Sequence, residues 1–83
     1  MKWRKFDIYD AVCDVGLFRL LVMRQDGNTV WWGVDCVGTR VSGGFSGDIQ
    51  SAKIGAVKGM IERIKVQERQ ALEALAELEG LTA

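Results

Sequence analysis

The fold of this chain is decided by residues 17–37, LFRLLVMRQDGNTVWWGVDCV, in which two apolar runs flank an Asp-Gly pair. The bulky apolar side chains on both sides favour β-strands, and Asp26-Gly27 predicts a two-residue type I′ turn, which needs positive φ at both central positions. Gly38-Thr39 offers a second tight turn, with Gly able to take the first position of type II′. A short strand over residues 40–45 would follow. This stretch therefore predicts an antiparallel meander.

The segments on either side of the meander complete the predicted fold. Residues 3–9, WRKFDIY, alternate partly and indicate a further strand, although residues 7–15 could also hold a helical turn. From residue 48 to residue 79 no proline occurs and the apolar period becomes helical; Ser46 or Asp48 can cap the start, and Gly80 suits the position after the end. We therefore expect one domain over residues 1–83: an α+β fold with an antiparallel β-meander of three to four strands (about residues 2–45) packed on one long C-terminal helix (about residues 48–79).

The apolar stripe of the predicted helix has two parts. The first is expected to face the sheet and consists of Ala56, Val57, Met60, Ile61 and Ile64, with Ile54 at its margin. Gly55 and Gly59 would let the helix sit closely on Trp32. About 32 helical residues span roughly 48 Å, whereas a nine-residue strand covers only about 30 Å, so the second part overhangs the sheet. It carries Leu72, Leu75, Leu78 and Leu81, and we expect Leu72, Leu75 and Leu78 to form a homodimer interface.

The register of the hairpin decides which side chains face away from the helix. With Asp26-Gly27 as the whole turn, Leu21 lies opposite Trp32 and Met23 opposite Val30, and this face is predicted to lie under the helix. One helix covers one face of a sheet, so the other face would be left to a partner. It carries Phe18, Leu20, Val22 and Trp31, of which Phe18, Leu20 and Trp31 are the predicted partner-binding residues. A bulged three-residue turn would exchange parts of these two sets.

Composition argues against catalysis and cofactors. The 83 residues have equal numbers of acidic and basic side chains, no histidine and two cysteines, so the commonest general base and the commonest zinc ligand are both absent. We expect no enzyme activity, no metal and no cofactor, and we interpret Asp7, Asp10 and Asp14 as solvated edge and turn residues. No apolar run could span a bilayer, and a cytoplasmic protein with reduced thiols is the simplest interpretation.

An alternative function is a small nucleic-acid-binding module that uses the N-terminal strand. Lys2, Arg4 and Lys5 could contact phosphates while Trp3 stacks on a base. The competing interpretation is an edge strand protected by charge. Zero net charge and the glutamates interleaved with the basic residues of the helix favour this second interpretation.

Residues 17–61 resemble a pattern of small phage and prophage proteins, some of them anti-CRISPR proteins of similar size and element order. The shared features are Asp26-Gly27, Trp32-Gly33-Val34, the turn at Gly38, the short strand at residues 41–45 and the Ala/Gly-rich helix start at residues 52–60. The resemblance carries no site residues. It implies a phage-encoded, stoichiometric inhibitor that docks on a bacterial defence complex in the host cytoplasm. We therefore expect a non-catalytic, homodimeric protein-binding protein.

Overall fold

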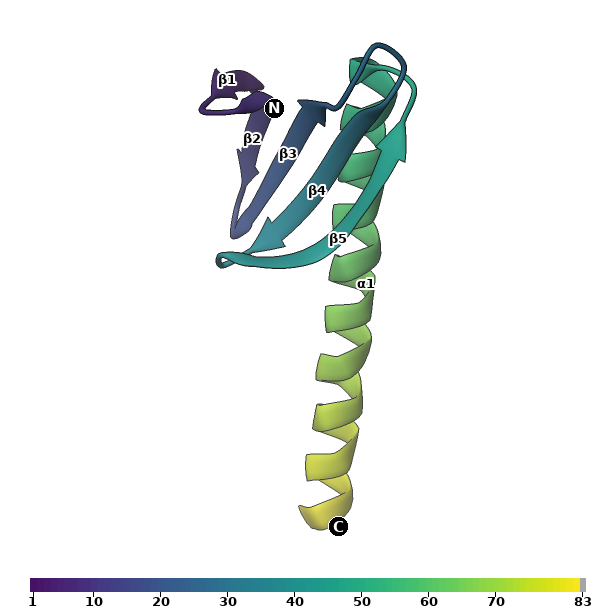
Figure 1. The fold of residues 1–83 in the computed structure, drawn as a ribbon. Helices are drawn as coiled ribbons and strands as arrows, with labels where there is room; N and C mark the ends of the chain where they lie inside the picture. The colour runs from purple at the N-terminus through teal and green to yellow at the C-terminus, as the bar shows by residue number, and fades with distance from the viewer. Residues whose placement is uncertain (83) are drawn as a thin grey trace.

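The computed structural model describes residues 1–82, and their side chains as far as Gly80, so the side chain of Leu81 lies outside the described part. Five strands precede a single helix (Figure 1): β1 (Arg4–Phe6), β2 (Tyr9–Val15), β3 (Phe18–Arg24), β4 (Val30–Cys36), β5 (Thr39–Ser46) and α1 (Ile49–Thr82). The strands form one antiparallel sheet in the order β1-β2-β3-β4-β5. The predicted α+β meander with one long C-terminal helix is confirmed, with five strands rather than three to four.

The extra strand arises because the N-terminal segment folds back on itself. The chain turns at Asp7-Ile8, where Phe6 pairs with Tyr9, and Asp7 has a φ of 55°. Aspartate tolerates this left-handed conformation better than most side chains. Residues 7–15, for which a helical turn was an alternative, therefore contain a tight turn followed by β2.

The loop between β3 and β4 is longer than the two-residue turn that the Asp-Gly pair predicts. Arg24 pairs with Val30, so five residues, 25–29, form the connection. The amides of Gln25 and Asp26 donate to the Thr29 carbonyl at 2.8 and 3.2 Å, and the Asn28 amide donates to Asp26 Oδ1 at 2.9 Å. The Asp26 side chain thus replaces a backbone acceptor, as Asx turns do. The type I′ prediction at Asp26-Gly27 is wrong.

This loop shifts the register of β3 by one residue. Val22, and not Leu21, lies opposite Trp32, while Met23 lies opposite Trp31. A one-residue shift exchanges the two faces of a strand. The face assignment of β4 is unaffected, whereas the assignment of β3 is reversed.

The turn between β4 and β5 also differs by one position from its prediction. Cys36 pairs with Thr39, which leaves Val37 and Gly38 as the central residues. Their φ values of 51° and 79° are both positive, as a type I′ turn requires. Gly38 therefore takes the second central position.

Helix α1 begins where the sequence predicts and ends later. The Asp48 side chain caps it, because Oδ1 accepts the Ser51 amide at 2.7 Å. At the other end the helix passes through Gly80 and ends at Thr82, so the predicted stop at Gly80 is wrong. Within residues 1–82, no stretch of helix combines the length and the apolar character that crossing a membrane requires.

The core lies between one face of the sheet and the small residues at the start of α1. Leu20, Val22, Val30 and Val34 are fully buried from the sheet side; Ala52 and Ala56 are fully buried from the helix side, and Met60 is buried beside them. A Cβ atom added to Gly55 would lie 2.7 Å from Trp32 Nε1, and one added to Gly59 would lie 2.8 Å from Trp32 Cζ3. The predicted close seating of the helix on Trp32 is confirmed.

The large isoleucines of α1 lie outside this core. Ile54, Ile61 and Ile64 are 46, 42 and 44% exposed, so their predicted place against the sheet is wrong. Because Trp32 fills the space beneath the helix, only a face of alanine and glycine can approach it closely. The isoleucine side chains therefore point away from the sheet.

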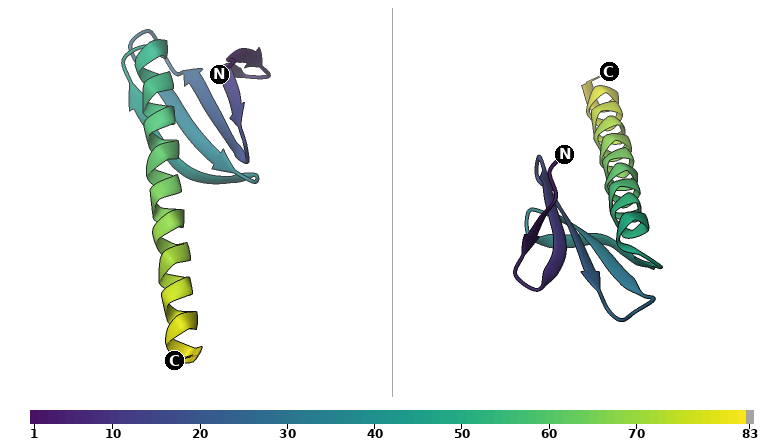
Figure 2. Two further views of the ribbon diagram at one scale, coloured as in Figure 1. Left: turned by 180° about the vertical axis from the view of Figure 1, so that it is seen from behind. Right: turned by 90° about the horizontal axis from the view of Figure 1, so that it is seen from above.

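The C-terminal half of α1 overhangs the sheet, as predicted. Every side chain from Gln67 to Gly80 is exposed, and Leu72, Leu75 and Leu78 are 59, 52 and 61% accessible. The molecule measures 59 × 20 × 19 Å, and both views of Figure 2 show the helix continuing past the strands. We call residues 67–80 the tail.

Candidate functional site

The three predicted partner-binding residues lie on two different faces of the sheet. Leu20 is fully buried in the core beside Ala56 and Met60, and Phe18 is half-buried against the same cluster. Their placement on the face away from the helix is wrong, because the loop at residues 25–29 shifts the register of β3. Trp31 does lie on the face away from the helix, as predicted, opposite Phe45 of β5. We call this side of the sheet the open face. The structure thus separates Trp31 from the other two.

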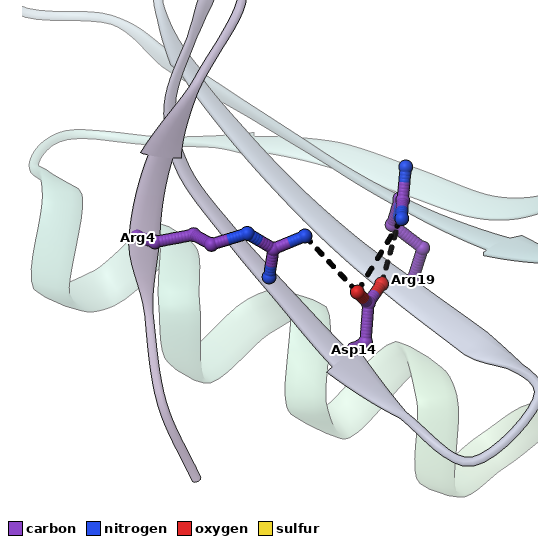
Figure 3. Close-up of polar contacts among 3 residues, drawn as sticks. All are labelled: Arg4, Asp14 and Arg19. Carbon is purple, nitrogen blue, oxygen red and sulfur yellow. Dashed lines mark hydrogen bonds and ion pairs between the residues drawn. The ribbon is translucent and has the colours of Figure 1, made fainter.

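A row of alternating charges crosses the open face and takes one residue from each strand. Asp14 lies opposite Arg19, Arg19 opposite Asp35, and Asp35 opposite Arg40. Arg4 Nη2 lies 3.1 Å from Asp14 Oδ2, and Arg19 Nε lies 2.7 Å from Asp14 Oδ1 (Figure 3). Arg40 and Asp35 form a further ion pair. We call these five residues the charge ladder.

Asp14 is the electrostatic centre of the ladder. Hydrogen bonds from Arg19 and then Arg4 hold the pKa of the Asp14 carboxyl below its ordinary value. The Asp14 carboxylate in turn raises the pKa of the Arg19 guanidinium. All three side chains are about half-exposed, so water screens the attraction and the ladder contributes mainly to register and side-chain position.

Sequence patterns contain a signal for this ladder that becomes visible once the turns are placed. Asp14 and Arg19 lie at equal distances from the turn at Gly16-Leu17, and Asp35 and Arg40 flank the turn at Val37-Gly38. Opposite charges placed symmetrically about a tight turn face each other on antiparallel strands. The interpretation of Asp14 as merely a solvated residue missed this pairing.

Next to the ladder lie three aromatic side chains, Tyr9, Trp31 and Phe45, and together with Arg40, which also belongs to the ladder, we call them the aromatic patch. The Trp31 ring lies over Gly33, where an added Cβ atom would be 2.5 Å from Trp31 Cη2. The Arg40 guanidinium covers the ring at 4.6 Å from its centroid, and the Tyr9 ring centroid lies 6.3 Å away. Phe45 is 67% exposed. Together with Met23 and Gln25, these side chains line a shallow hollow of about 360 Å³.

A second arginine–aromatic contact lies on the opposite edge of the sheet. The guanidinium carbons of Arg4 and Arg19 each lie 5.8 Å from the centroid of the Phe6 ring. Arginine held against an aromatic ring keeps N–H donors for a partner and loses little freedom on binding. The open face therefore offers fixed cationic and aromatic groups along its whole width.

The basic N-terminal segment is partly committed to contacts within the chain. Trp3 is half-buried against the core, with Lys53 Nζ 5.3 Å from its ring centroid, and Arg4 belongs to the charge ladder. Lys2 and Lys5 are exposed. Beside Trp3 an open groove of about 450 Å³ runs along the start of the helix; its lining is Met1, Trp3, Gln50, Lys53, Ile54, Val57 and Lys58.

Few side chains of reactive type come together. Among residues 1–82 no three histidine, cysteine, aspartate or glutamate side chains are grouped closely enough to hold a metal ion. Cys13 is buried and Cys36 half-buried, and both thiols are free. The groups that the chain does assemble are therefore arginines, aspartates and aromatic rings on the open face of the sheet.

Comparisons of this chain with models of protein families, with curated proteins and with solved structures found no match.

Proposed function

We propose that this chain is a non-catalytic protein-binding protein whose partner docks on the open face of the sheet, around the aromatic patch. The observation that carries this proposal is the stack of Arg40 on Trp31 beside the exposed ring of Phe45. Tryptophan, tyrosine and arginine are the residue types that most often dominate the binding energy of protein interfaces.

The patch is already organised before any partner arrives. Trp31 is packed onto Gly33, Arg40 is stacked on Trp31, and Asp35 is ion-paired with Arg40. A side chain that is held in place loses less conformational entropy on binding than a mobile one. This supports the open face as a recognition surface and the opposite face, under α1, as the structural one.

The partner class in this proposal comes from the resemblance to small phage proteins. We propose a bacterial defence complex of the CRISPR type as the target, which makes the chain a phage-encoded inhibitor acting in the host cytoplasm. Inhibition would be stoichiometric, since binding alone blocks the target.

The test is a phage plaque assay in bacteria with active CRISPR immunity. Expression of the chain should raise the plaquing efficiency of a targeted phage by at least tenfold. Phe45→Glu, on the aromatic patch, should abolish the effect. Leu17→Glu is the matched control, because Leu17 is 74% exposed but lies in the turn at the other end of the strands.

A binding measurement with purified effector complexes gives a second readout. We expect the unmodified chain and Leu17→Glu to bind one of them and Phe45→Glu to fail. If the chain neither raises plaquing efficiency nor binds an effector complex of any CRISPR type, the proposed target is refuted. Full activity of Phe45→Glu would refute the proposed surface.

A further inference from the structure

The outward stripe of α1 follows a seven-residue repeat. Its positions are separated alternately by three and four residues: Ile54, Val57, Ile61, Ile64, Glu68, Ala71, Leu75 and Leu78. We call these eight residues the seam. In coiled-coil notation Ile54 and Ile61 are a positions, whereas Val57 and Ile64 are d positions. A sustained repeat of this kind marks a helix surface that packs against another helix.

The seam is separate from the surface that packs on the sheet. At 100° per residue its centre lies roughly 130° around the helix from Ala52, Ala56 and Gly59. Ile61 and Leu75 are 42 and 52% exposed, and Val57 is the one seam residue that is half-buried against the core. The sheet and a second helix can therefore contact α1 at the same time.

We propose that the seam is covered by a second copy of this chain, with the two α1 helices antiparallel. This proposal does not depend on the proposed function. It concerns the helix, whereas the proposed function concerns the open face of the sheet.

The distribution of charge along α1 argues for the antiparallel direction. Residues 49–66 contain four basic residues and one glutamate, net +3, whereas residues 67–82 contain four glutamates and one arginine, net −3. A parallel pair would set like charges side by side, and an antiparallel pair sets each half beside its opposite. This distribution also opposes the helix macrodipole, which favours acidic side chains near the start of a helix and basic ones near its end. The stability of an isolated helix therefore does not account for it.

The pairing of residues along the seam also favours an antiparallel arrangement of the two helices. In an antiparallel pair centred on residue 66, Ile54 faces Leu78 of the second copy, Val57 faces Leu75, Ile61 faces Ala71 and Ile64 faces Glu68. In a parallel pair, Glu68 would instead face Glu68, and two carboxylates would meet in an apolar seam. The antiparallel register brings Glu68 close to Lys65 of the other copy. It thus removes the like-charge contact.

The groove beside Trp3 suits the tail of the second copy. Met1, Trp3, Ile54 and Val57 provide apolar surface there, with Lys53 and Lys58 also in its lining. In the same register Leu75 and Leu78 of the second copy arrive at this groove from an acidic segment. An apolar groove flanked by lysines thus meets leucines flanked by glutamates.

Sedimentation equilibrium of the full chain tests the association. We expect a dimer at tens of micromolar. Leu75→Glu should weaken the dimer at least tenfold. Gln70→Glu is the matched control: it adds the same charge to the tail at an exposed position roughly 140° around the helix from Leu75, and it should leave the dimer intact. A monomer for the unmodified chain, a larger assembly, or equal effects of the two variants would overturn the proposal.

Disulfide formation tests the direction. Ile54→Cys and Leu78→Cys are made separately in a Cys36→Ser background and then mixed under mild oxidation. The antiparallel pair should give chiefly the mixed product that joins residue 54 to residue 78, identified by its mass. Chiefly 54–54 and 78–78 products would show a parallel pair, and no product would show that these positions do not meet. Either result would overturn the proposed arrangement.

Discussion

Trp32 occupies the space that a side chain at Gly55 would need, with its indole nitrogen 2.7 Å from the position of an added Cβ atom. The close approach of α1 to the sheet depends on that missing atom. Alanine is the better helix former by about 1 kcal/mol, but here it would have to displace a packed indole.

Gly55→Ala should therefore destabilise the protein, by about 1–3 kcal/mol, which is the usual cost of overpacking a core. Gly80→Ala is the control, since an added Cβ atom there meets nothing within 4 Å. It should leave stability unchanged or raise it slightly. Urea denaturation of the two variants checks both values, and equal effects would contradict the close contact with Trp32.

The two adjacent tryptophans should respond differently to replacement. Trp32 lies between the sheet and Gly55 and Gly59, so Trp32→Ala should cost about 3–5 kcal/mol, enough to unfold a domain of this size. Trp31 lies on the open face, away from the helix, so Trp31→Ala should cost less and leave the chain folded. Thermal melts decide the matter: an unfolded Trp31→Ala beside a folded Trp32→Ala would reverse the roles of the two faces.

Acid should destabilise the fold through three carboxylates whose pKa values lie below the ordinary 3.8. The amide of Ser51 lowers the pKa of Asp48, the amide of Asn28 lowers that of Asp26, and Arg19 lowers that of Asp14. A lowered folded-state pKa contributes stability that is fully present above the unfolded value and is lost as the pH falls through the folded one. Melting temperature should therefore stay level down to about pH 4 and fall below it.

Asp48→Asn provides the matched control for this acid effect. Asparagine still accepts the Ser51 amide at the helix start but does not titrate. The fall in melting temperature below pH 4 should become shallower in this variant. An unchanged slope would show that Asp48 contributes nothing to the acid transition.

Nucleic acid should bind weakly, with a dissociation constant no tighter than the roughly 10⁻⁶ M end of non-specific binding at physiological salt. The net charge is zero, Trp3 packs against the core, and Arg4 is ion-paired. Fluorescence anisotropy with duplex and single-stranded probes measures this affinity. Tight binding that disappears when Lys2, Arg4 and Lys5 are neutralised would restore the alternative function of the N-terminal segment.

Periodicity and turn residues in the sequence predict the element order, a helix cap at Ser46 or Asp48, the seat of the helix on Trp32 and the overhanging tail. The register of β3 was not predictable in this way, because Asp26-Gly27 satisfies the rule for a two-residue turn while the Asp26 side chain stabilises a five-residue loop. That local choice moves Phe18 and Leu20 under the helix and leaves Trp31 outside. The charge ladder was missed because its opposite charges face each other only once the turns at Gly16-Leu17 and Val37-Gly38 are placed.

Helix α1 uses two surfaces of different chemistry: small side chains toward Trp32, and branched aliphatic side chains along the seam. Apart from Val57, no seam residue packs against the core. Substitutions at well-separated sites without shared partners add nearly independently in free energy. Substitutions in the seam can therefore change which helix binds there. The sheet and its open face stay unchanged. For protein engineering, the same separation means that the binding specificity of the seam can be redesigned without changing the rest of the domain.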